Sequence, residues 1–150
     1  MKSFVGAFAA FALLAASPAG AQGCLDRETL TAARVHEFST MMLAVSLRCR
    51  AIGVDIGAGN SAMLATHGPV FAAAHRRLQA FFGPDAHAFD GYATRLGNRY
   101  GAGATDPANC RRFETVARDL AASPGPAALG RVVFAMVAQP KIAGPACPPR

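Results

Sequence analysis

A cysteine between two arginines is the first feature of this chain that could support chemistry. In the stretch AVSLRCRAIGVD, residues 44–55, Cys49 lies between Arg48 and Arg50. Neighbouring cations can activate an accessible thiolate, and cysteines can also bind metals or form disulfides. Catalysis requires a sulfur that solvent can reach. The helical pattern around Cys49 therefore decides among these alternatives.

Apolar residues around Cys49 repeat at alternating spacings of three and four, which is typical of one face of an α-helix. Because Cys49 belongs to this stripe, we expect its sulfur to face the core and the two arginines to point toward solvent. The pattern favours a structural disulfide over a catalytic thiol. The stripe consists of Val35, Phe38, Met42, Val45, Cys49 and Ile52.

The other chemical motifs are weak, and we assign no catalytic residue, metal ligand or cofactor. The four histidines never occur as H-x-x-x-H or beside a cysteine or carboxylate pair, so no zinc site is predicted. The patterns G-x-S-x-G and C-x-x-C are both missing. Residues 57–62, GAGNSA, imitate a dinucleotide-binding loop but follow the expected end of a helix instead of a strand. We interpret them as a turn.

One polar stripe leaves an enzymatic alternative open. Asp90, Thr94 and Asn98 recur every four residues and would share one face of a helix. Such a line would suit the groove of a small, hydrolase-like envelope enzyme. More often, a polar stripe hydrogen-bonds to a neighbouring helix or faces water.

The N-terminus has the pattern of a secretory signal peptide. Lys2 precedes the apolar run FVGAFAAFALLAA, and Ala19 and Ala21 form an A-x-A cleavage signal. The run is shorter than the roughly 20 residues that span a bilayer. We therefore expect residues 1–21 to be removed, which predicts an exported, periplasmic protein with no membrane span. Lipidation of Cys24, which follows AQG, is an alternative.

Helical periodicity extends over the rest of the chain, with no alternating strand pattern. Pro69 is expected to kink or divide the second helical segment. The fold class is all-α, an antiparallel bundle of four to five helices stapled by two disulfides. It forms one helical domain over residues 22–138, followed by a proline-rich tail at 139–150. The helices are expected from Arg27 to Gly53 with Asp26 as N-cap, from Asn60 or Ser61 to Gly83, from about 84 to 100, from Pro107 with Asp106 as N-cap, and after SPGP.

Four cysteines follow the signal peptide, and an even count in an exported chain predicts two disulfides. If consecutive helices run up and down, the end of the first helix and the start of the fourth lie at one end of the bundle. This arrangement pairs Cys49 with Cys110. Cys24 then lies at the opposite end, and the tail is long enough to bring Cys147 back to it.

Arginines should also gather around the predicted Cys49–Cys110 disulfide. Cations suit the last turn of a helix but not its first turns, so the helix dipole does not explain Arg111 and Arg112. We predict an anion-binding surface for an anionic small molecule, a lipid headgroup or an acidic envelope protein, and no nucleic acid. This predicts a non-catalytic binding or interaction protein. The candidate residues are Arg48, Arg50, Arg99, Arg111 and Arg112.

Three stretches, LRCRAIGVD, AAAHRRLQAFF and FDGYATRLGNRYG, resemble an uncharacterised family of small exported helical proteins of Gram-negative bacteria. The resemblance covers roughly residues 40–120. It implies a periplasmic location and a helical domain with one or two disulfides. It implies no activity and no functional residues.

Overall fold

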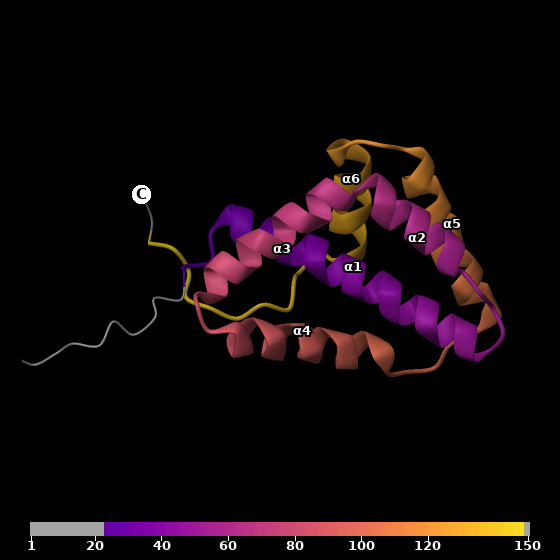
Figure 1. Cartoon of the computed structure of the whole chain (residues 1–150), viewed down its shortest axis with the longest axis horizontal. Coiled ribbons are helices and arrows are strands. Elements are labelled where there is room, and N and C mark those ends of the chain that lie inside the picture. Colours follow the sequence, from indigo (N-terminus) through magenta and orange to yellow (C-terminus); the bar gives the residue numbers. More distant parts are fainter. Residues whose placement is uncertain (1–22, 149–150) are drawn as a thin grey trace, which may run out of the picture.

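The computed structural model describes residues 23–148, and within them the chain is helical, with six helices and no strand (Figure 1). The expected all-α bundle with two disulfides is confirmed. The predicted signal peptide, residues 1–21, lies outside the described residues. The helices are α1 (Arg27–Ala51), α2 (Gly57–Thr66), α3 (Gly68–Phe82), α4 (Ala86–Gly101), α5 (Pro107–Ala122) and α6 (Pro126–Met136).

The longest helix, α1, is central and contacts each of the other five (Figure 1). It begins as expected, because the Asp26 carboxylate accepts a hydrogen bond from the Thr29 backbone N–H at 2.8 Å. The predicted apolar stripe faces the core from Val35 to Cys49, and Phe38, Met42 and Cys49 are fully buried. Its last member, Ile52, was wrongly included: it follows the end of α1 and is 44% exposed. Helices α3 and α4 pack along α1, while α2 pairs mainly with α5.

The second predicted segment is divided into two helices, which accounts for the sixth helix. The division falls at His67, which ends α2 and precedes α3, and Pro69 occupies the start of α3, where a proline is tolerated. His67 is buried at this joint, and its Nε2 lies 2.9 Å from the Leu120 carbonyl oxygen of α5.

The helix α2 starts at Gly57, three or four residues before the predicted start at Asn60 or Ser61. The stretch GAGNSA forms the first turns of the helix, instead of a turn that precedes it. Asp55 Oδ1 accepts a hydrogen bond from the Gly57 N–H at 2.8 Å, and Gly59 lies close against α5. These contacts offset the low helix propensity of the glycines. A smaller difference occurs at α4, which was expected to begin at Pro84 but begins at Ala86, because the Asp85 side chain caps the helix by accepting the His87 N–H.

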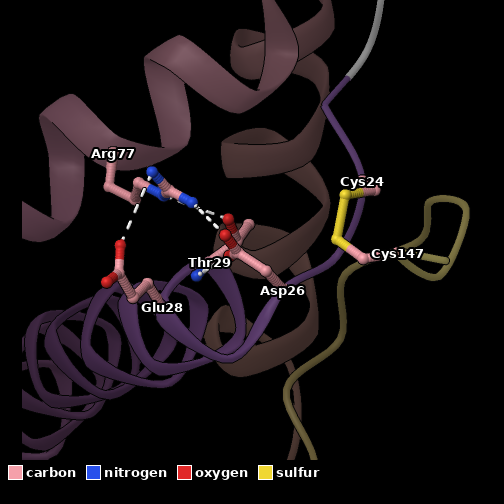
Figure 2. The surroundings of a disulfide bond; sticks show 6 residues. All are labelled: Cys24, Asp26, Glu28, Thr29, Arg77 and Cys147. Atoms are coloured by element: carbon pink, nitrogen blue, oxygen red, sulfur yellow. Dashed lines mark hydrogen bonds and ion pairs between the residues drawn. A yellow bond between two sulfur atoms is a disulfide. The ribbon is translucent and has the colours of Figure 1, made fainter. Parts of the chain in front are cut away.

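The predicted cysteine pairing is confirmed. Cys49 and Cys110 join the end of α1 to the start of α5, with their Cα atoms 5.7 Å apart. Cys24 and Cys147 join the two ends of the described chain, with their Cα atoms 4.8 Å apart (Figure 2).

The proline-rich tail returns along α1 to the start of that helix. Glu37 of α1 accepts a hydrogen bond from the Lys141 backbone N–H at 2.6 Å. Farther along, the Leu25 N–H donates to the Pro145 carbonyl oxygen at 2.7 Å, beside the Cys24–Cys147 disulfide. The tail is therefore held by hydrogen bonds as well as by a covalent link.

Candidate functional site

Arg48 occupies the centre of the predicted arginine cluster, but its guanidinium is used inside the protein. It is half-buried and makes four hydrogen bonds, one to the last turn of α4 and three to the segment that joins α4 to α5. The planar guanidinium carries several N–H donors, so one arginine can bind several acceptors at once. We name this set of four hydrogen bonds the Arg48 clamp. Its Nε donates to Thr105 Oγ1 at 2.6 Å, and its Nη atoms donate to the carbonyl oxygens of Tyr100, Ala102 and Ala104 at 2.8 to 3.0 Å.

The other four candidate arginines are exposed, and we name them the basic end: Arg50, Arg99, Arg111 and Arg112. Arg50 Nη2 lies 3.7 Å from Asp55 Oδ2, with both side chains largely exposed. The described part of the chain holds no ion pair that includes Arg99, Arg111 or Arg112.

The Cys49–Cys110 disulfide brings the basic end together. The Cα atoms of Arg50 and Arg111 cannot be more than about 13 Å apart, because the cysteine Cα atoms are separated by 5.7 Å and consecutive Cα atoms by about 3.8 Å. Arg99 belongs to the same end, since Arg48 binds the carbonyl oxygen of Tyr100. The structure thus places these arginines at one end of the molecule.

A groove beside the basic end was missed by the sequence reasoning. It lies between α1 and α2, has a volume of about 300 Å³, and we name it the Asn60 groove. The stretch GAGNSA could have indicated this groove, but it was interpreted as a turn. In the structure it is helical and forms one wall of the groove. The lining residues are Leu43, Ser46, Leu47, Arg50, Asp55, Gly57, Ala58, Asn60 and Ser61.

The opposite end of α1 carries charges that are already paired (Figure 2). The Arg77 guanidinium binds the Asp26 carboxylate, donates to Thr29 Oγ1 at 3.1 Å, and lies 3.7 Å from Glu28 Oε2. Hydrogen bonding from Thr29, followed by that from Arg77, holds the pKa of Asp26 well below its usual value. Glu28 and Arg77 border an apolar cleft of about 490 Å³ between α1 and α3.

Two polar atoms are buried without partners where α1, α3 and α4 meet. They are His36 Nε2 and the Tyr92 hydroxyl. Burial, followed by the charge of His75, lowers the pKa of His36, and burial also raises the pKa of Tyr92. The rings of His36 and His75 are 6.2 Å apart. Among residues 23–148, no group of three or more potential ligands is placed to hold a metal ion.

The polar stripe proposed for the enzymatic alternative lies on the exposed surface of α4. Asp90, Thr94 and Asn98 are all exposed. Asp90 borders a hollow of about 210 Å³ at the turn between α3 and α4, but Thr94 and Asn98 do not line it. The three side chains therefore do not converge on that hollow.

The chain matches no model of a known protein family, no curated protein and no solved structure. The resemblance to an exported helical family therefore stays a prediction. Within the described residues, no helix is both long and apolar enough to cross a membrane.

Proposed function

We propose that this chain is a non-catalytic binding protein of the bacterial periplasm whose basic end holds an anionic partner. One observation carries the proposal. A buried disulfide and the Arg48 clamp fix the ends of three helices together, and the arginines of the basic end remain exposed there. The only acidic side chain in an ion pair with them, among the described residues, is Asp55.

The position of Arg111 and Arg112 supports the proposal that this surface binds an anion from outside the protein. Both lie in the second turn of α5, past the first turn to which the helix dipole is largely confined, so the dipole does not account for their position. An anion bound beside them would interact favourably with both guanidinium groups. Asp106 contributes one negative charge, and its Oδ1 already accepts the Asn109 N–H at 2.8 Å.

The proposed location rests on the disulfides and on the N-terminal sequence. Both cysteine pairs are formed, and structural disulfides persist in oxidising compartments such as the periplasm. Residues 1–21 have the composition of a secretory signal. A periplasmic protein would meet anionic lipid headgroups and acidic envelope proteins, which are the partner classes expected for this surface.

The proposal is tested by the salt dependence of binding to two anionic probes. One probe is a vesicle of phosphatidylglycerol mixed with phosphatidylcholine, and the other is polyglutamate, which represents an acidic protein. We expect binding to at least one probe at low salt and a steep loss as salt screens the charges. Vesicles of phosphatidylcholine alone are the control. Failure to bind either probe at low salt would contradict the proposal.

A further inference from the structure

The two disulfides differ in how readily a dissolved thiol can reach them. Cys49 and Cys110 are both 0% exposed. Cys24 and Cys147 are partly exposed and lie in segments without helical structure (Figure 2), and Cys24 lines a surface hollow of about 250 Å³. Thiol–disulfide exchange requires a thiolate to approach one of the two sulfur atoms, so its rate depends on access. The Cys24–Cys147 disulfide is therefore the one with which a thiol in solution reacts first.

Apart from this disulfide, the proline-rich tail is held to the helices by few contacts. Only Ile142 of the tail packs against the hydrophobic core. The Lys141 N–H donates to Glu37, and the Pro145 carbonyl oxygen accepts the Leu25 N–H. Single hydrogen bonds contribute modestly to net stability, because water binds the same groups when the bond opens. The covalent link therefore supplies a large part of the attachment of the tail.

The tail covers a buried carboxylate and an aromatic ring, those of Glu37 and Phe81, which we name together the tail seat. Glu37 is 1% exposed, and its two oxygens accept the Tyr100 hydroxyl and the Lys141 N–H. Gly144 lies directly on Phe81, because a Cβ added at Gly144 would be only 2.7 Å from Phe81 Cζ. If the tail left, water would reach both side chains and would replace the Lys141 N–H as a donor to the carboxylate. The tail is thus a cover over groups that are otherwise hidden.

We infer that the Cys24–Cys147 disulfide is a redox latch, which a dithiol protein opens to release the tail and expose the tail seat. One thiolate of the dithiol attacks a sulfur of the disulfide, which forms a mixed disulfide and frees the other cysteine as a thiolate. The second thiol of the dithiol then displaces the attached cysteine from the mixed disulfide. Two electrons and two protons are transferred in total, so Cys24 and Cys147 end as thiols and the dithiol ends as a disulfide.

The helices should stay together while the latch is open. The buried Cys49–Cys110 disulfide is out of reach of the dithiol and continues to join α1 to α5. The latch lies at the start of α1, whereas the basic end lies beside Cys49, at the other end of that helix. This inference therefore goes beyond the anionic partner of the basic end, and the failure of either proposal leaves the other standing.

Timed reduction of the disulfide-bonded protein tests the access on which the latch depends. The probes are dithiothreitol and reduced thioredoxin, and the new thiols are alkylated and located by peptide mass spectrometry. We expect Cys24 and Cys147 to be labelled about tenfold or more sooner than Cys49 and Cys110, because their disulfide is within reach. A thioredoxin variant without its second thiol should stay attached to Cys24 or Cys147 as the mixed disulfide. Equal labelling of all four cysteines, or attachment to Cys49 or Cys110, would overturn the inference.

Hydrogen exchange tests whether reduction opens the tail. In the selectively reduced protein, the N–H groups of Leu25 and Lys141 should exchange about tenfold or more faster than in the disulfide-bonded protein, while those of α2 and α5 stay unchanged. The matched control combines Cys24→Ser with Cys147→Ser. In this variant, exchange at both positions should already be fast, and the reductant should add nothing. If exchange of Leu25 and Lys141 is unchanged by reduction, the tail does not open and the inference is wrong.

Discussion

At the scale of single residues, Glu37 joins three parts of the chain through one buried carboxylate. It is 1% exposed on α1, accepts the Tyr100 hydroxyl at the end of α4 at 2.5 Å, and accepts the Lys141 N–H of the tail at 2.6 Å. Burial, with the hydrogen bond to Glu37 as the next cause, raises the pKa of Tyr100 to about 12. The phenol therefore stays protonated and donates at any physiological pH.

Glu37→Gln should destabilise the fold by about 1–3 kcal/mol, because one amide N–H₂ group would then face a donor inside the protein. Urea unfolding followed by circular dichroism measures the change. Tyr100→Phe is the control, since it removes one hydrogen bond and leaves the Lys141 bond in place. An unfolding midpoint for Glu37→Gln equal to that of the unchanged protein would show that the carboxylate contributes no net stability.

His36 should make stability depend on pH in the weakly acidic range. Its pKa is lowered in the folded state from the ordinary value of 6.5, so below that value the unfolded chain binds the proton more readily. The free energy of unfolding should therefore fall as pH decreases from 6.5 toward the folded-state pKa, and it should be level above this window. The groups that face His36 are His75 of α3 and Tyr92 of α4.

Urea unfolding at several pH values between about 5 and 8, within the titration range of histidine, measures this dependence. His36→Leu should flatten the slope below pH 6.5, whatever its effect on overall stability. His87→Leu is the control, because His87 is exposed. If His36→Leu and the unchanged protein share the same slope, another group causes the acid sensitivity.

At the scale of elements, the segment between α4 and α5 is held by Arg48 instead of by its own secondary structure. The Arg48 bonds reach three carbonyl oxygens and one hydroxyl, and Gly103 in this segment has a positive φ of 103°. A planar, multidentate donor is required for this arrangement.

Arg48→Lys keeps the charge but loses most of these bonds, so it should cost about 1–3 kcal/mol. Hydrogen exchange should also become faster for residues 101–106. The matched control is Arg50→Lys, whose surface ion pair is worth little, about 0–1 kcal/mol in general. Unchanged exchange in this segment would mean that Arg48 does not hold it.

The helices could be predicted where their signals are local. Asp26 and Asp106 lie directly before the helices that they cap, and the stripe through Cys49 repeats over a whole helix. The start of α2 could not be predicted, because Gly59 is accommodated by its contact with α5, about 60 residues away in sequence. The contact between Gly59 and α5 outweighs the low helix propensity of glycine.

At the scale of the whole molecule, the two disulfides differ in the parts of the chain that they join. The Cys49–Cys110 disulfide is fully buried and joins two helices, whereas Cys24–Cys147 is partly exposed and fastens the tail. In the chain-entropy model, either loop contributes about 4–5 kcal/mol, less any native strain.

Paired alanine variants should separate these roles. Replacing Cys49 and Cys110 should lower the thermal midpoint and speed hydrogen exchange throughout the helices. Replacing Cys24 and Cys147 should speed exchange mainly in residues 138–148 and around Leu25, since the tail packs only Ile142 against the core and adds no fully buried residue beyond Val137. Equal exchange patterns for the two variants would contradict this division.

The candidate site was predicted only in part. Cysteine pairing and helix direction placed Arg50 and Arg111 together, because a bundle with short connections has few possible arrangements. The role of Arg48 and the Asn60 groove could not be predicted, since both depend on how the side chains of separate elements meet. Arg48 and Arg50 are two residues apart, yet one binds a loop and the other faces solvent.

The central claim, that the basic end binds an anionic partner, is tested most directly by two variants of equal net charge. One changes Arg99, Arg111 and Arg112 to Gln, and the other changes three exposed arginines elsewhere, Arg27, Arg76 and Arg131, to Gln. Affinity for the better of the two anionic probes is measured at low salt. We expect the first variant to lose about tenfold or more and the second to lose much less, because the contacts are local. An equal loss in both variants would contradict the claim.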